Sequence, residues 1–232
     1  MIGVKFGTKH SFRDFGLILT SKTVSFPKPK TESVTIPGAD GQLDLSTALT
    51  DGDVKYDNRS LTFKFSVINP QKNWETVKST LANYLHGQKM NVILDVDKGF
   101  YYVGRCTLDS WSESKKLGTL TIKVDAEPYK YSVLESTDDW LWDIFNFESG
   151  VIYNLSDITV SGTKVVTVRS MRMKVVPTIT VSANMDVRFK GVQYGLTAGE
   201  NRNLNIILSE GDNELTFIGT GTVSINFRGG SL

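Results

Sequence analysis

The sequence predicts a mainly β fold: two β-sandwich domains, of which the first carries one packed α-helix and a long β-hairpin arm. Most apolar runs alternate with polar residues at a period of two, which is typical of strands with one buried face. Clusters rich in glycine and aspartate, which favour tight turns, separate these runs. Only one segment, after Asn69 and Pro70, has its apolar residues at helical spacing.

Five segments of the first half are predicted strands: residues 15–19, 61–66, 92–96, 101–108 and 119–124. Leu61, Phe63 and Phe65 alternate with polar neighbours, so one face of that strand is expected to be buried. Cys106 is the only cysteine, so it cannot form an intrachain disulfide. Its place in a strand-like run predicts a small buried side chain.

One amphipathic helix is predicted in the first half. Asn69 suits its N-cap, Pro70 its first helical position and Gly87 its C-terminal stop. The apolar stripe between them consists of Trp74, Val77, Leu81 and Leu85. Because the rest of the helix is polar, this stripe is expected to pack against the sheet.

The segment of residues 36–65 combines turn-forming clusters with a strand and contains no residue suited to catalysis. Its turn clusters are Pro37-Gly38, Asp40-Gly41 and Asp51-Gly52-Asp53. Proline and glycine supply the fixed and the permissive backbone angles that tight turns need. We interpret the segment as a long ordered arm that forms an assembly surface.

The second half predicts a separate β-sandwich. The strand pattern stops near Ser132, where a polar cluster follows, so we expect domains at residues 1–132 and 133–232. The first carries 18 Lys+Arg against 14 Asp+Glu, a net charge of +4, and the second 8 against 11, or −3. The alternating runs beyond the boundary are Ile179/Val181/Ala183, Leu204/Ile206/Leu208, Leu215/Phe217 and Val223/Ile225/Phe227. Such short, turn-separated runs are typical of a sandwich.

The net charge and the distribution of apolar residues exclude two classes of protein. A net charge of +1 and a pI of 7.7 do not fit a strongly basic nucleic-acid-binding protein. The N-terminal segment lacks the apolar core of a signal peptide, and no run approaches the ~20 apolar residues of a membrane span. We therefore expect synthesis in a cytoplasm and no membrane partner.

The sequence predicts no enzyme activity, cofactor or metal. Nucleophilic catalysis needs a histidine beside a nucleophile, and the chain has only His10, expected in a turn or interface, and His86, expected at the helix end. No Cys or His spacing suits zinc. Gly219-Thr220-Gly221 precedes a strand pattern rather than a helix, so a hairpin turn is predicted there instead of a phosphate-binding loop.

One segment keeps a sugar-related alternative open. Asp138, Asp139 and Asp143 interleave with Trp140 and Trp142, and glycosidases place paired carboxylates beside aromatic surfaces. A carbohydrate-binding module that recognises cell-wall polysaccharide could use the two tryptophans without catalysis. In the third interpretation the aromatic residues seal the junction between the domains, and the aspartates face water.

Most of residues 10–132 resemble a known family. The resemblance rests on four segments: SFRDFGLIL (residues 11–19), IPGADGQLDLSTALTDGDVKYDNRSLTFKF (36–65), the single helix after Asn69-Pro70, and EPYKY (127–131). Together they resemble the distal tail protein family of long, non-contractile-tailed bacteriophages (siphoviruses) and related prophages. The ending GTGTVSINFRGGSL is similar to the C-terminal β-sandwich of that family.

The resemblance implies a structural tail-tip adaptor in the virion. The N-terminal domains would close into a homohexameric ring, with the arm as a belt between neighbours, and the galectin-like C-terminal domains would point outward. Partners would be the tail tube protein and the tail-tip (tail-associated) protein, and the tape-measure and receptor-binding proteins are further candidates. DNA would pass through the lumen without specific binding. The belt residues implied at the inter-subunit interface are Pro37, Gly38, Asp40, Gly41, Asp44 and Asp51.

Charge along the arm suggests how neighbours would meet. The basic set is Lys22, Lys28 and Lys30, and the acidic set is Asp40, Asp44, Asp51 and Asp53. If one edge of the arm is basic and the next is acidic, the two would pair across subunits and set their register more than their strength of association. In the alternative all seven side chains are simply solvated.

Overall fold

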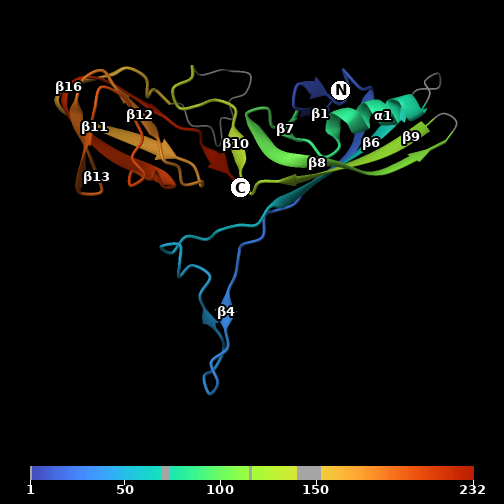
Figure 1. Cartoon of the computed structure of the whole chain (residues 1–232), viewed down its shortest axis with the longest axis horizontal. Helices are drawn as coiled ribbons and strands as arrows, with labels where there is room; N and C mark the ends of the chain where they lie inside the picture. The colour runs from blue at the N-terminus through green and yellow to red at the C-terminus, as the bar shows by residue number, and fades with distance from the viewer. Residues whose placement is uncertain (1, 69–73, 115–116, 140–152) are drawn as a thin grey trace. The chain divides into compact units, whose positions relative to one another are not determined.

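The computed structural model describes residues 2–68, 74–114, 117–139 and 153–232. These residues form two compact units: Met1–Val96 with Tyr102–Pro128, and Asp97–Tyr101 with Tyr129–Leu232. Each unit has its own buried apolar core. The prediction of a mainly β fold is confirmed, as is the single helix within the described ranges (Figure 1).

The first unit is built on one antiparallel sheet in the order β2-β1-β7-β8-β9-β6-β3. The strands are β1 (Val4–Phe6), β2 (Lys9–His10), β3 (Leu17–Val24), β6 (Arg59–Ile68), β7 (Lys89–Leu94), β8 (Phe100–Glu113) and β9 (Leu117–Ala126). As predicted, Leu61, Phe63 and Phe65 of β6 are buried, with at most 1% of their surface exposed. The period-two pattern therefore identified both the strand and its inner face.

The sheet of the first unit curls over its own core. Four strand-to-strand steps separate β1 from β6, which in a flat sheet would span about 19 Å. The rings of Phe6 on β1 and Phe63 on β6 nevertheless meet edge to face, with centroids 5.8 Å apart. Strands β1 and β6, each next to an end strand of the sheet, thus face each other across one apolar layer, and this aromatic contact joins them.

The helix α1 (Trp74–Leu85) covers this core as its stripe predicts. Leu81 and Leu85 are buried, and Trp74 and Val77 pack against the same cluster while half-buried. Gly87 follows the helix with a φ of 77°, a conformation that glycine adopts without strain. The predicted N-terminal residues Asn69 and Pro70 lie outside the described residues.

The second unit contains a six-stranded sheet and a short pair. Its strands are β10 (Lys130–Ser132), β11 (Ile158–Ser170), β12 (Thr178–Val181), β13 (Met185–Phe189), β14 (Val192–Leu196), β15 (Gly199–Asn201), β16 (Gly211–Asn226) and β17 (Gly230–Ser231). Strand β16 pairs with β11 along its length and, on its other edge, first with β13 and then with β12. β10 pairs with β17 and with Phe100 and Tyr101, the first two residues of β8, which belong to the second unit.

The predicted hairpin at Gly219-Thr220-Gly221 is wrong. These residues lie inside β16, so the runs around Leu215 and Val223 form one strand instead of two. Gly219 and Gly221 have φ values of 151° and 153°, and an added Cβ would lie 2.6 Å from Met185 Cβ and from Ser182 Oγ, respectively. The glycines therefore allow β12 and β13 to share one edge of β16 at close approach.

The predicted strand at Leu204/Ile206/Leu208 is also wrong. Only Leu208 pairs, in an isolated bridge to Val175, and Leu204 is 73% exposed. Asn203 explains the turn that replaces the strand, because its side chain accepts the backbone N–H of Asn205 at 3.0 Å. Ile206 and Leu208 are nonetheless buried, so at these two positions the alternation indicated burial rather than strand pairing.

No helix among the described residues combines the length and the apolar character needed to span a membrane.

Replacing Gly219 by alanine should destabilise the second unit by about 2–5 kcal/mol, because positive φ strain adds to a contact at 2.6 Å. Its register partner Gly162 is the matched control, since it has a φ of 80° but nothing within 4 Å of an added Cβ. Gly162→Ala should lose only about 1–2 kcal/mol. Urea denaturation, monitored by circular dichroism, measures the free energy of unfolding of both variants. Equal losses of stability would contradict the close-approach argument.

Candidate interaction surface

The candidate site is the arm, residues 25–58, which leaves the sheet after β3 and returns at β6. Its two ends are joined through Ser25 and Ser60. The backbone N–H of Ser25 donates to the carbonyl of Ser60 at 3.0 Å, and the backbone N–H of Ser60 donates to Ser25 Oγ at 2.9 Å. The chain therefore enters and leaves the arm at one fixed point.

The joined ends of the arm at Ser25 and Ser60 form its root. Arg59 stabilises this root from within the first unit. It is only 4% exposed, and its Nε and Nη1 donate to the carbonyls of Ser25 at 2.8 Å and Pro128 at 3.2 Å. Its guanidinium lies over the ring of Tyr102, 5.3 Å from the centroid. Burial lowers the pKa of Arg59 from its ordinary value, and Tyr102 opposes that shift. The planar fork of arginine thus binds the arm to the end of the sheet.

Beyond the root, the two sides of the arm run antiparallel with few main-chain hydrogen bonds. Pro29 and Tyr56 form an isolated bridge, followed by the two-residue strands β4 (Ser33–Val34) and β5 (Leu43–Asp44) (Figure 1). Glu32 adds a side-chain link, because its N–H donates to Ser46 Oγ at 2.8 Å. The predicted ordered arm is therefore a hairpin held by short, local interactions.

Two turns shape the far part of the arm. Residues 35–42 form the tip, where Gly38 and Gly41 have φ values of 84° and 75°. Residues 47–53 form a side turn, in which Asp51 has a φ of 52° and Gly52 one of 82°. Aspartate and glycine are among the residues that tolerate this left-handed region, so both predicted turn clusters fit their positions.

Apolar side chains on the arm are exposed to solvent. Seven of the fifteen exposed large apolar residues of the described chain lie between residues 26 and 54. They are Phe26 (84%), Val34 (42%), Ile36 (45%), Leu43 (49%), Leu45 (38%), Leu49 (99%) and Val54 (40%). Such a concentration makes the arm a candidate interaction surface, because exposed apolar residues are usually scattered singly. These apolar residues were not among the predicted interface residues, although Leu43 and Leu45 alternate with polar neighbours in the sequence.

Several of the charged residues predicted to meet across subunits have partners within the chain. Lys55 lies 3.6 Å from Asp53, and Lys30 lies 3.9 Å from Asp57. Asp44 accepts the backbone N–H of Ser46 at 2.8 Å, and hydrogen bonds from Ser46 lower the pKa of this exposed carboxyl.

The remaining interface candidates occupy exposed places on the arm. Pro37, Gly38, Asp40 and Gly41 lie in the tip, and Asp51 lies in the side turn. Lys22 is exposed on β3, and Lys28 is exposed near the root. A role for any of them between subunits stays a prediction.

The other candidate residues are structural where the chain is described. His10 Nδ1 accepts the backbone N–H groups of Phe12 and Arg13, so its proton lies on Nε2, which donates to Asp95 at 3.0 Å. Cys106 is fully buried as predicted, and burial raises the pKa of its thiol to about 12.

His86 follows α1, and its Nδ1 accepts the backbone N–H of Leu108 at 3.2 Å. Within the described ranges, no three His, Cys, Asp or Glu side chains are grouped so that they could hold a metal ion. Trp140 and Trp142, the candidate sugar contacts, lie outside the described residues, as does Asp143.

A scan against protein-family models finds no match. A search of curated proteins finds none either. Among solved structures, the chain is similar to the crystal structure of the Dit protein (gp 19.1) of phage SPP1, described as a paradigm of the hub adsorption apparatus in phages that infect Gram-positive bacteria. The TM-score is 0.62 at 13% sequence identity, over 98% of this chain and 99% of that chain. The two proteins thus share their fold along almost their whole lengths.

Arg59→Ala should loosen the root of the arm, because the carbonyls of Ser25 and Pro128 would lose a charged donor inside the unit. We expect a loss of about 2–4 kcal/mol in stability, with Arg59→Lys losing less, and faster cleavage of the arm by trypsin. Exposed Arg13→Ala is the control. Limited proteolysis and urea denaturation measure the two effects, and an Arg59→Ala protein that behaves like the control would contradict the anchor.

Proposed function

We propose that this chain is a structural hub protein of a bacteriophage tail, a distal tail protein that joins the tail tube to the tail-tip and host-adsorption apparatus. The observation that carries the proposal is the arm, which is fixed at its root, ordered by local hydrogen bonds and lined with exposed apolar side chains. The shared fold with a phage hub protein supports the same role. An arm of this kind is suited to contact a neighbouring protein rather than a small substrate.

The proposed assembly is a homohexameric ring in which the arm acts as a belt. An arm that contacts a different surface on the next copy makes a head-to-tail interface, and such interfaces close into rings when the rotation between copies fits. The value of six follows from the family resemblance. The belt contacts are assigned to the tip and to β5, with Pro37, Gly38, Asp40, Gly41 and Asp44, and to Asp51 of the side turn.

The proposed role is structural and located in the virion, at the tip of the tail. The ring would contact the tail tube protein on one side and the tail-tip protein on the other, with receptor-binding proteins docked on the second unit. A chain with a net charge of +1 leaves DNA able to pass a lumen without being held by a dense basic lining. No catalytic step is assigned to any residue.

Light scattering coupled to size exclusion tests the assembly. The full chain should elute with the mass of a closed oligomer, and negative-stain images should show rings. The matched variant replaces residues 32–53 by Asn-Gly, because the N–H of Lys30 already donates to the carbonyl of Lys55 at 2.8 Å and the shortened hairpin can close there. It should be monomeric and folded. A full chain that stays monomeric up to high concentration, alone and with a tail tube protein, would reject the ring.

Charge reversal tests the proposed register. Asp40→Lys with Asp44→Lys should reduce the oligomer fraction at low salt and have less effect at high salt, because exposed charges are screened there. Glu200→Lys with Glu214→Lys makes the same change in net charge on exposed positions of the second unit and should leave the mass unchanged. An arm variant with the wild-type mass at low salt would discard the charge pairing but keep the ring.

A further inference from the structure

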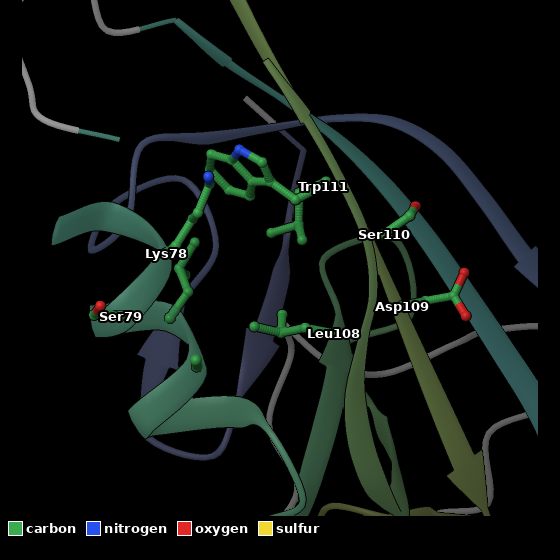
Figure 2. Close-up of a pocket in the computed structure, with 9 residues that line it drawn as sticks. Lys78, Ser79, Leu108, Asp109, Ser110 and Trp111 are labelled. Atoms are coloured by element: carbon green, nitrogen blue, oxygen red, sulfur yellow. The ribbon is translucent and has the colours of Figure 1, made fainter. Parts of the chain in front are cut away.

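The first unit contains an apolar groove between α1 and the strand β8, with a volume of about 290 Å³ (Figure 2). The residues that shape it are Lys78, Leu81, Ala82, Leu108, Trp111 and Leu120. Leu81 and Leu120 are buried beneath it, and Leu108 and Trp111 are half-buried at its side. An apolar cavity of roughly half this volume already accepts a benzene-sized group.

A β-bulge creates the groove. The pairing of β8 with β9 shifts between Leu108 and Ser110, so Asp109 is an extra residue on β8. Figure 2 shows Leu108 and Trp111 directed toward the helix, whereas Asp109 and Ser110 point away from it. Two successive residues thus turn away from α1, and the space beside the helix stays open.

The charges around the groove are compensated. Lys78 Nζ lies 2.7 Å from Glu75 and 3.1 Å from Glu113, and it stands 5.7 Å from the ring centroid of Trp111. Asp109 pairs with Lys123 at 2.8 Å. An uncharged apolar side chain is therefore the occupant that this groove favours over a charged one.

The arm carries an apolar side chain suited to this groove. Leu49 is 99% exposed and lies in the side turn of residues 47–53. Backbone hydrogen bonds from Thr50 and Gly52 to the carbonyl of Thr47, at 3.2 and 3.3 Å, close the turn around it. Burying a leucine whose main chain is already held in a closed turn is favourable, because little further ordering of the backbone is required.

We propose that Leu49 of one copy inserts into the groove between α1 and β8 of the neighbouring copy, an inference that rests on the proposed ring. Leu49 and the groove lie on different surfaces of the same unit, so a closed head-to-tail ring would pair each Leu49 with the groove of a neighbour. A specific interface buries about 800 Å² on each partner, more than one leucine supplies. The exposed Val34, Ile36 and Leu43 of the same arm provide the remaining apolar area.

Cysteine cross-linking between two singly substituted proteins tests the contact. Leu49→Cys and Ala82→Cys, mixed in equal amounts and oxidised mildly, should give a covalent dimer on non-reducing gels, while neither alone should do so. The native Cys106 does not interfere, because it is fully buried and its pKa is raised to about 12. The control mixes Ala82→Cys with Leu204→Cys, which places a thiol on a 73% exposed position of the second unit.

Blocking the contact gives a second readout. Leu49→Asp and Ala82→Trp, which fills the groove, should each weaken association by about 10- to 100-fold, as expected when the burial of one leucine is lost. Leu204→Asp should leave association unchanged. Circular dichroism confirms that each variant is folded, and Leu49→Asp keeps the proposal testable if Ala82→Trp disturbs α1.

Light scattering on the same samples separates the two hypotheses. Oligomers of wild-type mass that neither cross-link nor respond to Leu49→Asp would overturn the groove contact and leave the ring intact. A chain that stays monomeric, alone and with a tail tube protein, would overturn the ring and the groove contact together. Cross-linking only between Leu49→Cys and Ala82→Cys, with weaker assembly of both blocking variants, is the supporting result.

Discussion

The rest of the structure depends on one constraint: the arm cannot bury its own apolar residues. Its two strands have two residues each, and an isolated two-stranded hairpin is marginally stable in water. Local links such as the one between Glu32 and Ser46 fix its path, but they cover little surface. The free energy of burying Leu43 and Leu49 is therefore available only from contact with another surface, and this is why the arm is the candidate interaction surface.

The first unit provides the rigid base from which the arm extends. The contact between Phe6 and Phe63 closes the curled sheet. Arg59, the first residue of β6, connects the root of the arm to this sheet through its hydrogen bond to Ser25. The same sheet holds an irregularity, the bulge at Asp109, which opens the groove beside α1. The arm and the groove thus belong to one folded unit, so a single chain carries both halves of the proposed head-to-tail contact.

The sequence predicted those features that depend on local pattern. Burial at Phe63, the helical stripe through Leu81 and the turn at Gly52 follow from periodicity and backbone preference. It could not predict that Gly219 lies mid-strand, because a turn and a close approach between strands favour the same residue. Nor could it show that Arg59 anchors the arm, since its acceptors, at Ser25 and Pro128, are distant in the chain.

Charged and apolar side chains of the arm are expected to contribute differently to a contact with another protein. Lys30, Lys55 and Asp44 already have partners within the chain, and exposed ion pairs contribute about 0–1 kcal/mol each. Burial of a single leucine is worth about 1.5–3 kcal/mol, so the apolar residues supply most of the strength of any contact that the arm makes. In the proposed ring, the carboxylates of the tip and the side turn would set the register between neighbours, because oppositely charged groups have to align as the apolar side chains are buried.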